Sequence, residues 1–210
     1  MPKFVRGQKA KLESLTAETE FRVKIELLWP GPSEMDAACF ALNGQNRLED
    51  EGYLVFFNNK QSPEGALRLA EFSRDSAVFL TDLDKLPGFV KRLLFTLTPD
   101  GREDLGRLGP SRLTLETSDG ERLVTFEFDG SLIAGDSAVE LFDIYEKLGV
   151  WRCGARLLGH QGMGLRELIE LHGGEVGEDE AEDVRKGPPA AEKTQLDPPP
   201  AEIILPREGK

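Results

Sequence analysis

Histidine and cysteine are scarce in this 210-residue chain, which has two of each. The histidines, His160 and His172, and the cysteines, Cys39 and Cys153, do not have the spacing of zinc ligands, and there is no CxxC pair. Two cysteines in apolar stretches, without a disulfide framework, are typical of buried free thiols in a reducing compartment. The sequence therefore excludes a zinc finger and a disulfide scaffold as the basis of the fold.

Long apolar segments are missing as well. No run approaches the roughly 18–20 residues that a membrane-spanning helix needs. Residues 1–6 lack the apolar segment and the small residues of a secretory signal. Both features predict a cytoplasmic protein without a transmembrane segment.

Basic residues are outnumbered, with 26 Lys and Arg against 38 Asp and Glu, and the formal net charge is -12 at pH 7. Proteins that bind nucleic acids draw most of their affinity from Lys and Arg that neutralise phosphates. The composition therefore argues against a nucleic-acid partner. The same acidic field can concentrate divalent cations near clustered carboxylates.

Period-two alternation is the main pattern that the chain does have. Between Phe21 and Leu27, every second residue is apolar and the residues between are charged, which predicts a half-buried strand. Further short strand-like segments, bounded by Gly, Pro, Asp or Asn, are residues 36–42, 53–57, 77–83, 90–98, 112–117 and 123–128. Many short strands at near-regular spacing predict a mainly β fold, a sandwich of two antiparallel sheets.

The last apolar segments are less uniform. Residues 138–147 fit a helical face through Val139, Phe142 and Tyr145, but they also fit a hairpin with residues 151–158, which we favour. Residues 165–171 repeat apolar side chains at helical spacing and precede two glycines. This pattern predicts a short C-terminal helix.

The composition changes near residue 175. Residues 175–210 hold ten acids and five bases, with an acidic block followed by a Pro-rich stretch. Such a segment cannot bury enough apolar surface to offset its ordering entropy. We therefore predict one β-sandwich domain, residues 1–175, followed by a disordered acidic and Pro-rich tail, residues 176–210.

Six groups of motifs carry a family resemblance, in the same order along the chain. They are residues 3–9, 34–40, 55–59 with 62–65, 83–87, 140–151, and 159–162 with 164–168. Together they resemble the TerD family of tellurite-resistance and general stress-response proteins. The resemblance covers roughly residues 3–176, a single domain of ordinary size. It implies a β-sandwich, a stress or tellurite-resistance setting, and calcium binding as in better-studied members.

A calcium ion needs six to eight oxygen ligands. The family supplies them from an Asp-x-Asp near the second strand and from a later loop dense in Gly and Asp, and the first motif survives here as Glu34 and Asp36. The loop position, residues 66–76, holds two acids, Glu71 and Asp75, together with two arginines. The candidate metal ligands are therefore Glu34, Asp36 and Asp75. The favoured interpretation is that these acids lie in turns and on the surface of a metal-poor member of the family, and the alternative is a degraded calcium site. No cofactor is expected.

Enzymatic motifs are few. There is no G-x-S-x-G elbow and no Walker loop. A hydrolase would have to use His160, expected in the glycine-rich turn before the helix, or an acid/base pair of Asp82 and Asp84 on one strand face. The favoured prediction is a non-enzymatic stress-response or tellurite-resistance binding domain that acts through protein partners. The alternatives are a scaffold whose Pro-rich tail docks a partner, and a small-molecule hydrolase.

Overall fold

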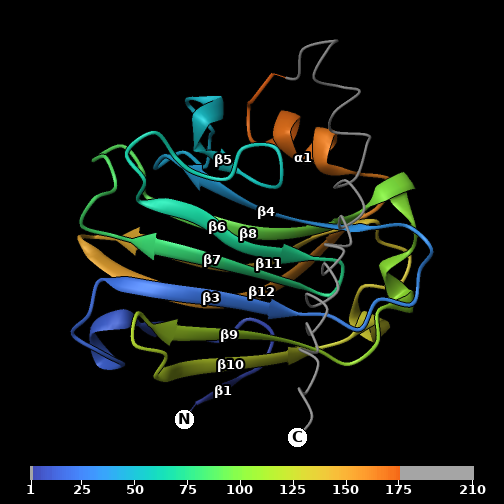
Figure 1. Cartoon of the computed structure of the whole chain (residues 1–210), viewed down its shortest axis with the longest axis horizontal. Helices are drawn as coiled ribbons and strands as arrows, with labels where there is room; N and C mark the ends of the chain where they lie inside the picture. The colour runs from blue at the N-terminus through green and yellow to red at the C-terminus, as the bar shows by residue number, and fades with distance from the viewer. Residues whose placement is uncertain (1, 176–210) are drawn as a thin grey trace, which may run out of the picture.

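The structure is a computed structural model that describes residues 2–175. These residues form two stacked sheets (Figure 1). The first sheet has the order β1 (Lys3–Phe4), β10 (Arg122–Phe128), β9 (Ser111–Thr117), β3 (Glu20–Glu26), β7 (Ser76–Asp82), β6 (Leu67–Ser73). The second has the order β2 (Lys9–Lys11), β12 (Val150–His160), β11 (Ala138–Lys147), β8 (Arg92–Pro99), β4 (Met35–Leu42), β5 (Leu54–Val55). All strand pairs are antiparallel except β1 with β10. The predicted β-sandwich is confirmed.

The core lies between the inner faces of the two sheets. The alternation that predicted β3 places Phe21, Val23 and Ile25 in this core, each at most 1% exposed. Across the interface, Phe79 of the first sheet contacts Phe95 of the second edge to face, with ring centroids 5.3 Å apart. Burial of such side chains is the dominant stabilising contribution in a sandwich of this kind.

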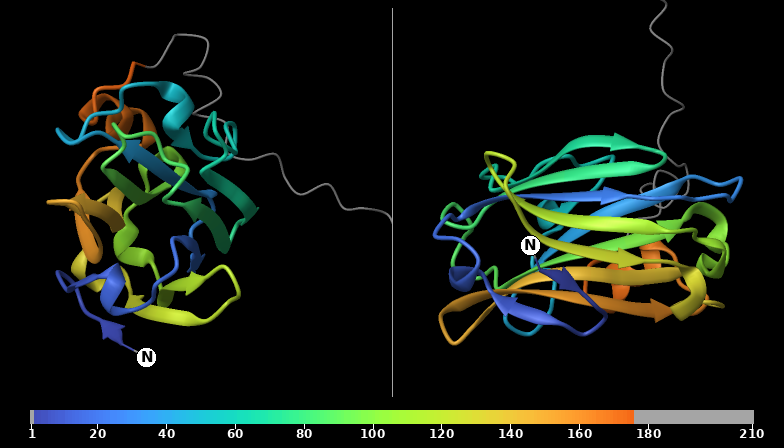
Figure 2. Two further views of the ribbon diagram at one scale, coloured as in Figure 1. Left: turned by 90° about the vertical axis from the view of Figure 1, so that its left-hand side faces the viewer. Right: turned by 90° about the horizontal axis from the view of Figure 1, so that it is seen from below.

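A second apolar cluster lies on the outer face of the second sheet, beneath the helix α1 (Leu165–Leu171). Leu165, Leu168 and Ile169 of the helix pack there against β4 and β8. Every residue of β4 is buried, because β4 has the core on one face and α1 on the other. Figure 2 shows the two sheets as layers, with α1 on the outer side of the second. The predicted C-terminal helix is therefore confirmed, and it completes the burial of β4.

The N-terminal segment is divided between the sheets. β1 forms the edge of the first sheet next to β10, and β2 forms the edge of the second sheet next to β12. The first eleven residues thus cover one edge of each sheet. Both strands are too short to produce a periodic pattern, and the sequence did not predict them.

Other local expectations had mixed outcomes. The hairpin of residues 138–147 with 151–158 is confirmed as β11 and β12, which turn at Leu148 and Gly149 with positive φ. The segment 66–76, interpreted as a loop, is instead β6 and its turn into β7. The predicted strand 53–57 is mostly irregular and retains only the two residues of β5. The predicted tail lies outside the described residues, and none of the helices in residues 2–175 meets the length and apolarity needed to cross a membrane.

Both cysteines are inaccessible to solvent, which predicts a chemical behaviour. Cys39 on β4 and Cys153 on β12 are 0% exposed, and burial raises the pKa of Cys153 to about 12. Since the thiolate is the reactive form, we expect neither thiol of the native chain to react with an aqueous aromatic disulfide reagent over minutes. In guanidinium chloride both should react. If the native protein rapidly released one equivalent of the reagent's aromatic thiolate per chain, one of the two thiols would be accessible, which would contradict this burial.

Candidate functional site

The candidate ligand Asp36 lies on the outer face of the second sheet, at the N-terminal end of α1. An open depression there is lined by Thr98, Asp100, Arg102 and Glu167, among others. Asp36 is 4% exposed, and its Oδ1 has no hydrogen-bond partner in the described part of the chain. Burial raises the pKa of Asp36 to about 7, with smaller contributions from the negative charges of Asp100 and Glu34. The site is thus a carboxyl group that gives up its proton only near neutrality.

The predicted metal ligands do not converge. Glu34 is near enough to influence Asp36, and its carbonyl accepts a hydrogen bond from the Asp100 amide at 2.9 Å. Asp75 is exposed in the turn between β6 and β7, in the other sheet, and Glu71 is exposed on β6. Within residues 2–175, no three His, Cys, Asp or Glu side chains are grouped so that they could hold a metal ion. Calcium binding by Glu34, Asp36 and Asp75 therefore stays a prediction.

The candidate acid/base pair does not occupy one strand face. Asp82 ends β7, and its carboxylate accepts hydrogen bonds from the backbone amides of Asp84 and Lys85, as in a turn. Burial acts to raise the pKa of Asp82, but the hydrogen bonds and the charge of Lys85 outweigh it and lower the pKa. Asp84 accepts a hydrogen bond from the Thr19 hydroxyl at 2.8 Å. Both carboxylates are therefore engaged in local structure, and the prediction that they share a strand face is wrong.

Two buried carboxylates, which the sequence did not single out, lie on the outer face of the second sheet beside α1. Arg156 of β12 contacts both, at 2.5 Å from a Glu140 oxygen and 3.4 Å from an Asp143 oxygen. Arg92 of β8 approaches Asp143 at 3.7 Å. Burial raises the pKa of Asp143, although Arg92 and Arg156 act to lower it. The two arginines are what compensate the buried charge.

Both histidines join this network at Glu140. His160 Nε2 lies 3.3 Å and His172 Nε2 lies 3.7 Å from the same Glu140 oxygen. His160 is the last residue of β12, not a loop residue as the sequence suggested. Burial lowers the pKa of His172, whose ring packs on Phe40 with centroids 5.3 Å apart. We call Arg92, Glu140, Asp143, Arg156, His160 and His172 the buried ion network.

Local backbone features allow this arrangement. Glu140 and Asp143 are three residues apart and yet share the outer face, because the register of β11 shifts between Glu140 and Phe142. Opposite Asp143 on β12 stands Gly154, where an added Cβ would lie 2.9 Å from the Asp143 carboxylate and 3.2 Å from the Lys9 stem. The glycine thus gives room to a buried acid and to the cation above it.

Cationic side chains lie on the solvent side of the network. Lys9 and Lys11 of β2 pair in register with β12, which carries Arg152. The side chains of Lys9 and Arg152 form no hydrogen bond and no ion pair with any residue between 2 and 175. Lys9 lies 5.9 Å and Arg92 lies 5.4 Å from the centre of the Tyr145 ring. We call the cations of this surface the basic face: Lys9, Lys11, Arg92, Arg152 and Arg156.

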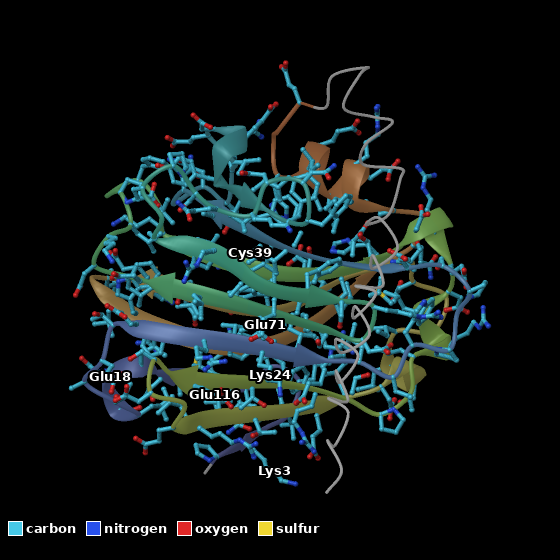
Figure 3. The ribbon with its side chains drawn as sticks, viewed as in Figure 1. Lys3, Glu18, Lys24, Cys39, Glu71 and Glu116 are labelled. Atoms are coloured by element: carbon cyan, nitrogen blue, oxygen red, sulfur yellow. The ribbon has the colours of Figure 1, made fainter. Side chains whose placement is uncertain are left out.

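The outer face of the first sheet is different. Figure 3 looks onto it and shows Lys24, Glu71 and Glu116 on three different strands. Several of its cations are paired with carboxylates, as Lys24 is with Glu26 at 2.9 Å and Arg122 with Glu116 at 3.6 Å, while Arg22 and Arg68 form no ion pair within residues 2–175. Exposed pairs of this kind contribute little to stability. On the basic face Lys11 pairs with Glu13 at 3.0 Å, and Lys9 and Arg152 form no ion pair within residues 2–175. What distinguishes the basic face is that its arginines lie over the buried carboxylates Glu140 and Asp143.

Comparisons with known proteins agree with this architecture. The family model described as the TerD domain matches residues 1–172. Tellurium resistance protein TerD of an Alcaligenes species is 25% identical over 177 residues, covering 76% of this chain and 91% of that protein. The uncharacterized protein YceE of Bacillus subtilis is 24% identical over 155 residues, covering 68% of this chain and 79% of its own.

Two solved structures share the fold. A crystal structure of a protein of unknown function has a TM-score of 0.59 at 15% identity and covers 76% of this chain and 99% of its own. A structure of a homologue of a telluride resistance protein from Streptomyces coelicolor has a TM-score of 0.57 at 18% identity and covers 73% of this chain and 98% of its own. The family model spans most of the chain, from the first strand to the end of α1. The chain belongs to the TerD family.

Proposed function

We propose that this chain is a non-catalytic binding domain that acts in the cytoplasm, in tellurite resistance or a related stress response, by binding protein partners. The observation that carries the proposal is the basic face, a set of cations positioned over buried carboxylates on a rigid sheet. Positioned charges on a surface favour association with a complementary partner and its specificity. The name of the Alcaligenes relative, tellurium resistance protein, supplies the physiological setting.

The surroundings of the titratable groups support binding over catalysis. A general base must be within reach of a proton on a substrate. The carboxylates of Glu140 and Asp143 are at most 5% exposed in their side chains, and Arg156 lies against both. His160 and His172 are both directed at Glu140. The carboxylates and imidazoles of the buried ion network are therefore engaged with one another.

A complementation experiment tests the proposal in the organism that carries the gene. We expect deletion of the gene to lower the tellurite concentration that the cells tolerate, and the wild-type gene to restore it. The variant Lys9→Glu/Arg152→Glu should fail to restore tolerance, because it reverses the charge of the two cations of the basic face that have no ion pair within residues 2–175. The matched control, Lys24→Glu/Arg112→Glu, makes the same charge change on the outer face of the first sheet and should restore tolerance.

Two results would overturn the proposal. Unchanged tolerance in the deletion strain would remove the tellurite role. Full complementation by both variants would remove the basic face as the binding surface. Thermal melts of both purified variants establish that any failure to complement is not caused by unfolding.

Calcium enters the proposal only as a weak ligand near Glu34 and Asp36, because Asp75 lies in the other sheet. We expect calorimetry to show no saturable micromolar binding. Melting temperatures with calcium and with chelator should agree, since only a ligand that binds the folded state raises the melting temperature. Micromolar binding that disappears in Asp36→Asn would contradict this expectation and restore a calcium-dependent role.

A further inference from the structure

We propose that the acidic segment at residues 178–183 binds the basic face of its own chain and competes there with acidic partners. This inference goes beyond the proposed function, because it assigns an intramolecular occupant to the surface. The segment carries five carboxylates in six residues. It is the densest acidic stretch in a chain whose net charge is -12.

The basic face has the complementary distribution of charge. The carboxylates of the buried ion network lie beneath it, with side-chain exposures of 2% for Asp143 and 5% for Glu140. The guanidinium side chains of Arg92 and Arg156 are about a quarter exposed, and Lys9 is exposed. The charge available at the surface is therefore mainly positive, although the carboxylates partly balance it from below. Carboxylates arriving from solvent form charge-assisted hydrogen bonds with such groups.

Two cations on this face lack a partner in the described residues. Lys9 and Arg152 sit on neighbouring strands, β2 and β12, and neither is ion-paired within residues 2–175. On the outer face of the first sheet, Lys24, Arg112 and Arg122 are paired with carboxylates, while Arg22 and Arg68 form no ion pair within residues 2–175. The basic face lies on the same side of the sandwich as α1, after which the acidic segment begins, and this position favours it over the outer face of the first sheet.

The segment begins within reach of this surface. His172, directly after α1, contacts Glu140, which in turn contacts Arg156 of the basic face. Residue 183 is eight positions beyond the last described residue, Glu175. A fully extended chain of eight residues reaches up to about 28 Å. A short flexible connection gives a tethered ligand an effective concentration on the order of millimolar. Modest affinity is then sufficient for the segment to occupy the face.

Competition with a probe of defined sequence tests the proposal. The probe is a fluorescent peptide that copies residues 176–186, and its binding to the purified full-length chain is measured by anisotropy at low salt. In one variant the five acids are neutralised: Glu178→Gln, Asp179→Asn, Glu180→Gln, Glu182→Gln and Asp183→Asn. We expect this variant to bind the probe at least about tenfold more tightly than the wild type, because its own competitor is gone.

Two further variants serve as controls. The first neutralises four other acids of the tail, Glu192, Asp197, Glu202 and Glu208, and should bind the probe as weakly as the wild type. The second adds Lys9→Gln and Arg152→Gln to the five neutralised acids and should lose the tighter binding. Raising the salt concentration to about 0.5 M should weaken all binding, since the interaction is between exposed charges.

Each remaining outcome overturns the proposal. If neither the wild type nor any of the variants binds the probe, the basic face does not accept acidic segments. If wild type and neutralised variant bind the probe equally, the face is open to partners and the segment does not occupy it. Because purified protein is measured, these results are independent of the tellurite experiment.

Discussion

Replacing Asp36 with asparagine should stabilise the protein at and above pH 7 and leave its stability almost unchanged below pH 4. The carboxyl group is buried, its Oδ1 has no hydrogen-bond partner within residues 2–175, and its pKa is raised to about 7 from an ordinary value of 3.8. Ionised Asp36 is therefore a destabilising charge in the folded chain. Asparagine has nearly the same shape and carries no charge.

The direction of the pH effect follows from proton binding in the two states. Between about pH 4 and 7 the folded state keeps the Asp36 proton that the unfolded state has released. The contribution of this group to the free energy of unfolding must then fall as the pH rises through that window, and it is constant above. At about 1.4 kcal/mol per pH unit, the difference between variant and wild type reaches up to about 4 kcal/mol above pH 7.

The measurement is urea unfolding of both proteins between pH 4 and 8, with the difference in free energy plotted against pH. Glu121→Gln, a change of an exposed acid in the β9–β10 hairpin, is the matched control and should give a flat difference. A flat difference for Asp36→Asn as well would mean that Asp36 ionises at its ordinary pKa. The variant being less stable at pH 8 would mean that the ionised carboxylate is stabilised by a group outside the described residues.

The second large effect is expected at Arg156. Replacing it with leucine leaves Glu140 without its arginine and leaves Asp143 with Arg92 alone, at 3.7 Å. Removing one partner of a buried ion pair costs about 3–5 kcal/mol, because the other charge stays buried without compensation. We expect a loss of this size in the free energy of unfolding, measured by urea denaturation at pH 7.

A double-variant cycle separates the ion pair from the packing of the arginine stem. In Arg156→Leu/Glu140→Gln the buried charge is also removed, so the double variant should be more stable than Arg156→Leu alone. The control Arg112→Leu breaks an exposed pair with Glu127 and should cost less than about 1 kcal/mol. If Arg156→Leu were no more destabilising than this control, the network would have no structural role.

Strands and turns with local signals could be predicted from the sequence. β3 alternates without interruption, the hairpin of β11 and β12 has a glycine turn, and α1 is followed by two glycines. β6 was missed although Leu67 and Leu69 alternate with exposed residues, because the family resemblance led us to expect a loop there. The alternation at Leu67 and Leu69 predicts a strand, but the family resemblance was given more weight.

The candidate site could be predicted only in part. Asp36 was identified as a possible ligand, but its burial depends on α1 and on residues 100–102, which are distant in sequence. Glu140 and Asp143 were missed because a register shift in β11 breaks the alternation that would have placed them on one face. Their partners come from β8, from β12 and from the residue after α1, and sequence periodicity carries no information about such contacts.

The split of the first eleven residues between the two sheets has a consequence for synthesis on the ribosome. β1 and β2 are made first, yet they pair with β10 and β12, and β12 ends at His160. At about 5–20 residues per second, roughly 150 further residues take about 8–30 s to be added. β1 has no partner strand until β10 has been made, and β2 has none until β12 has been made. Contacts of such high sequence separation form slowly. The edge of the sandwich therefore closes only after β12 has been made, and any pause before residue 160 prolongs the exposure of unpaired strands to aggregation.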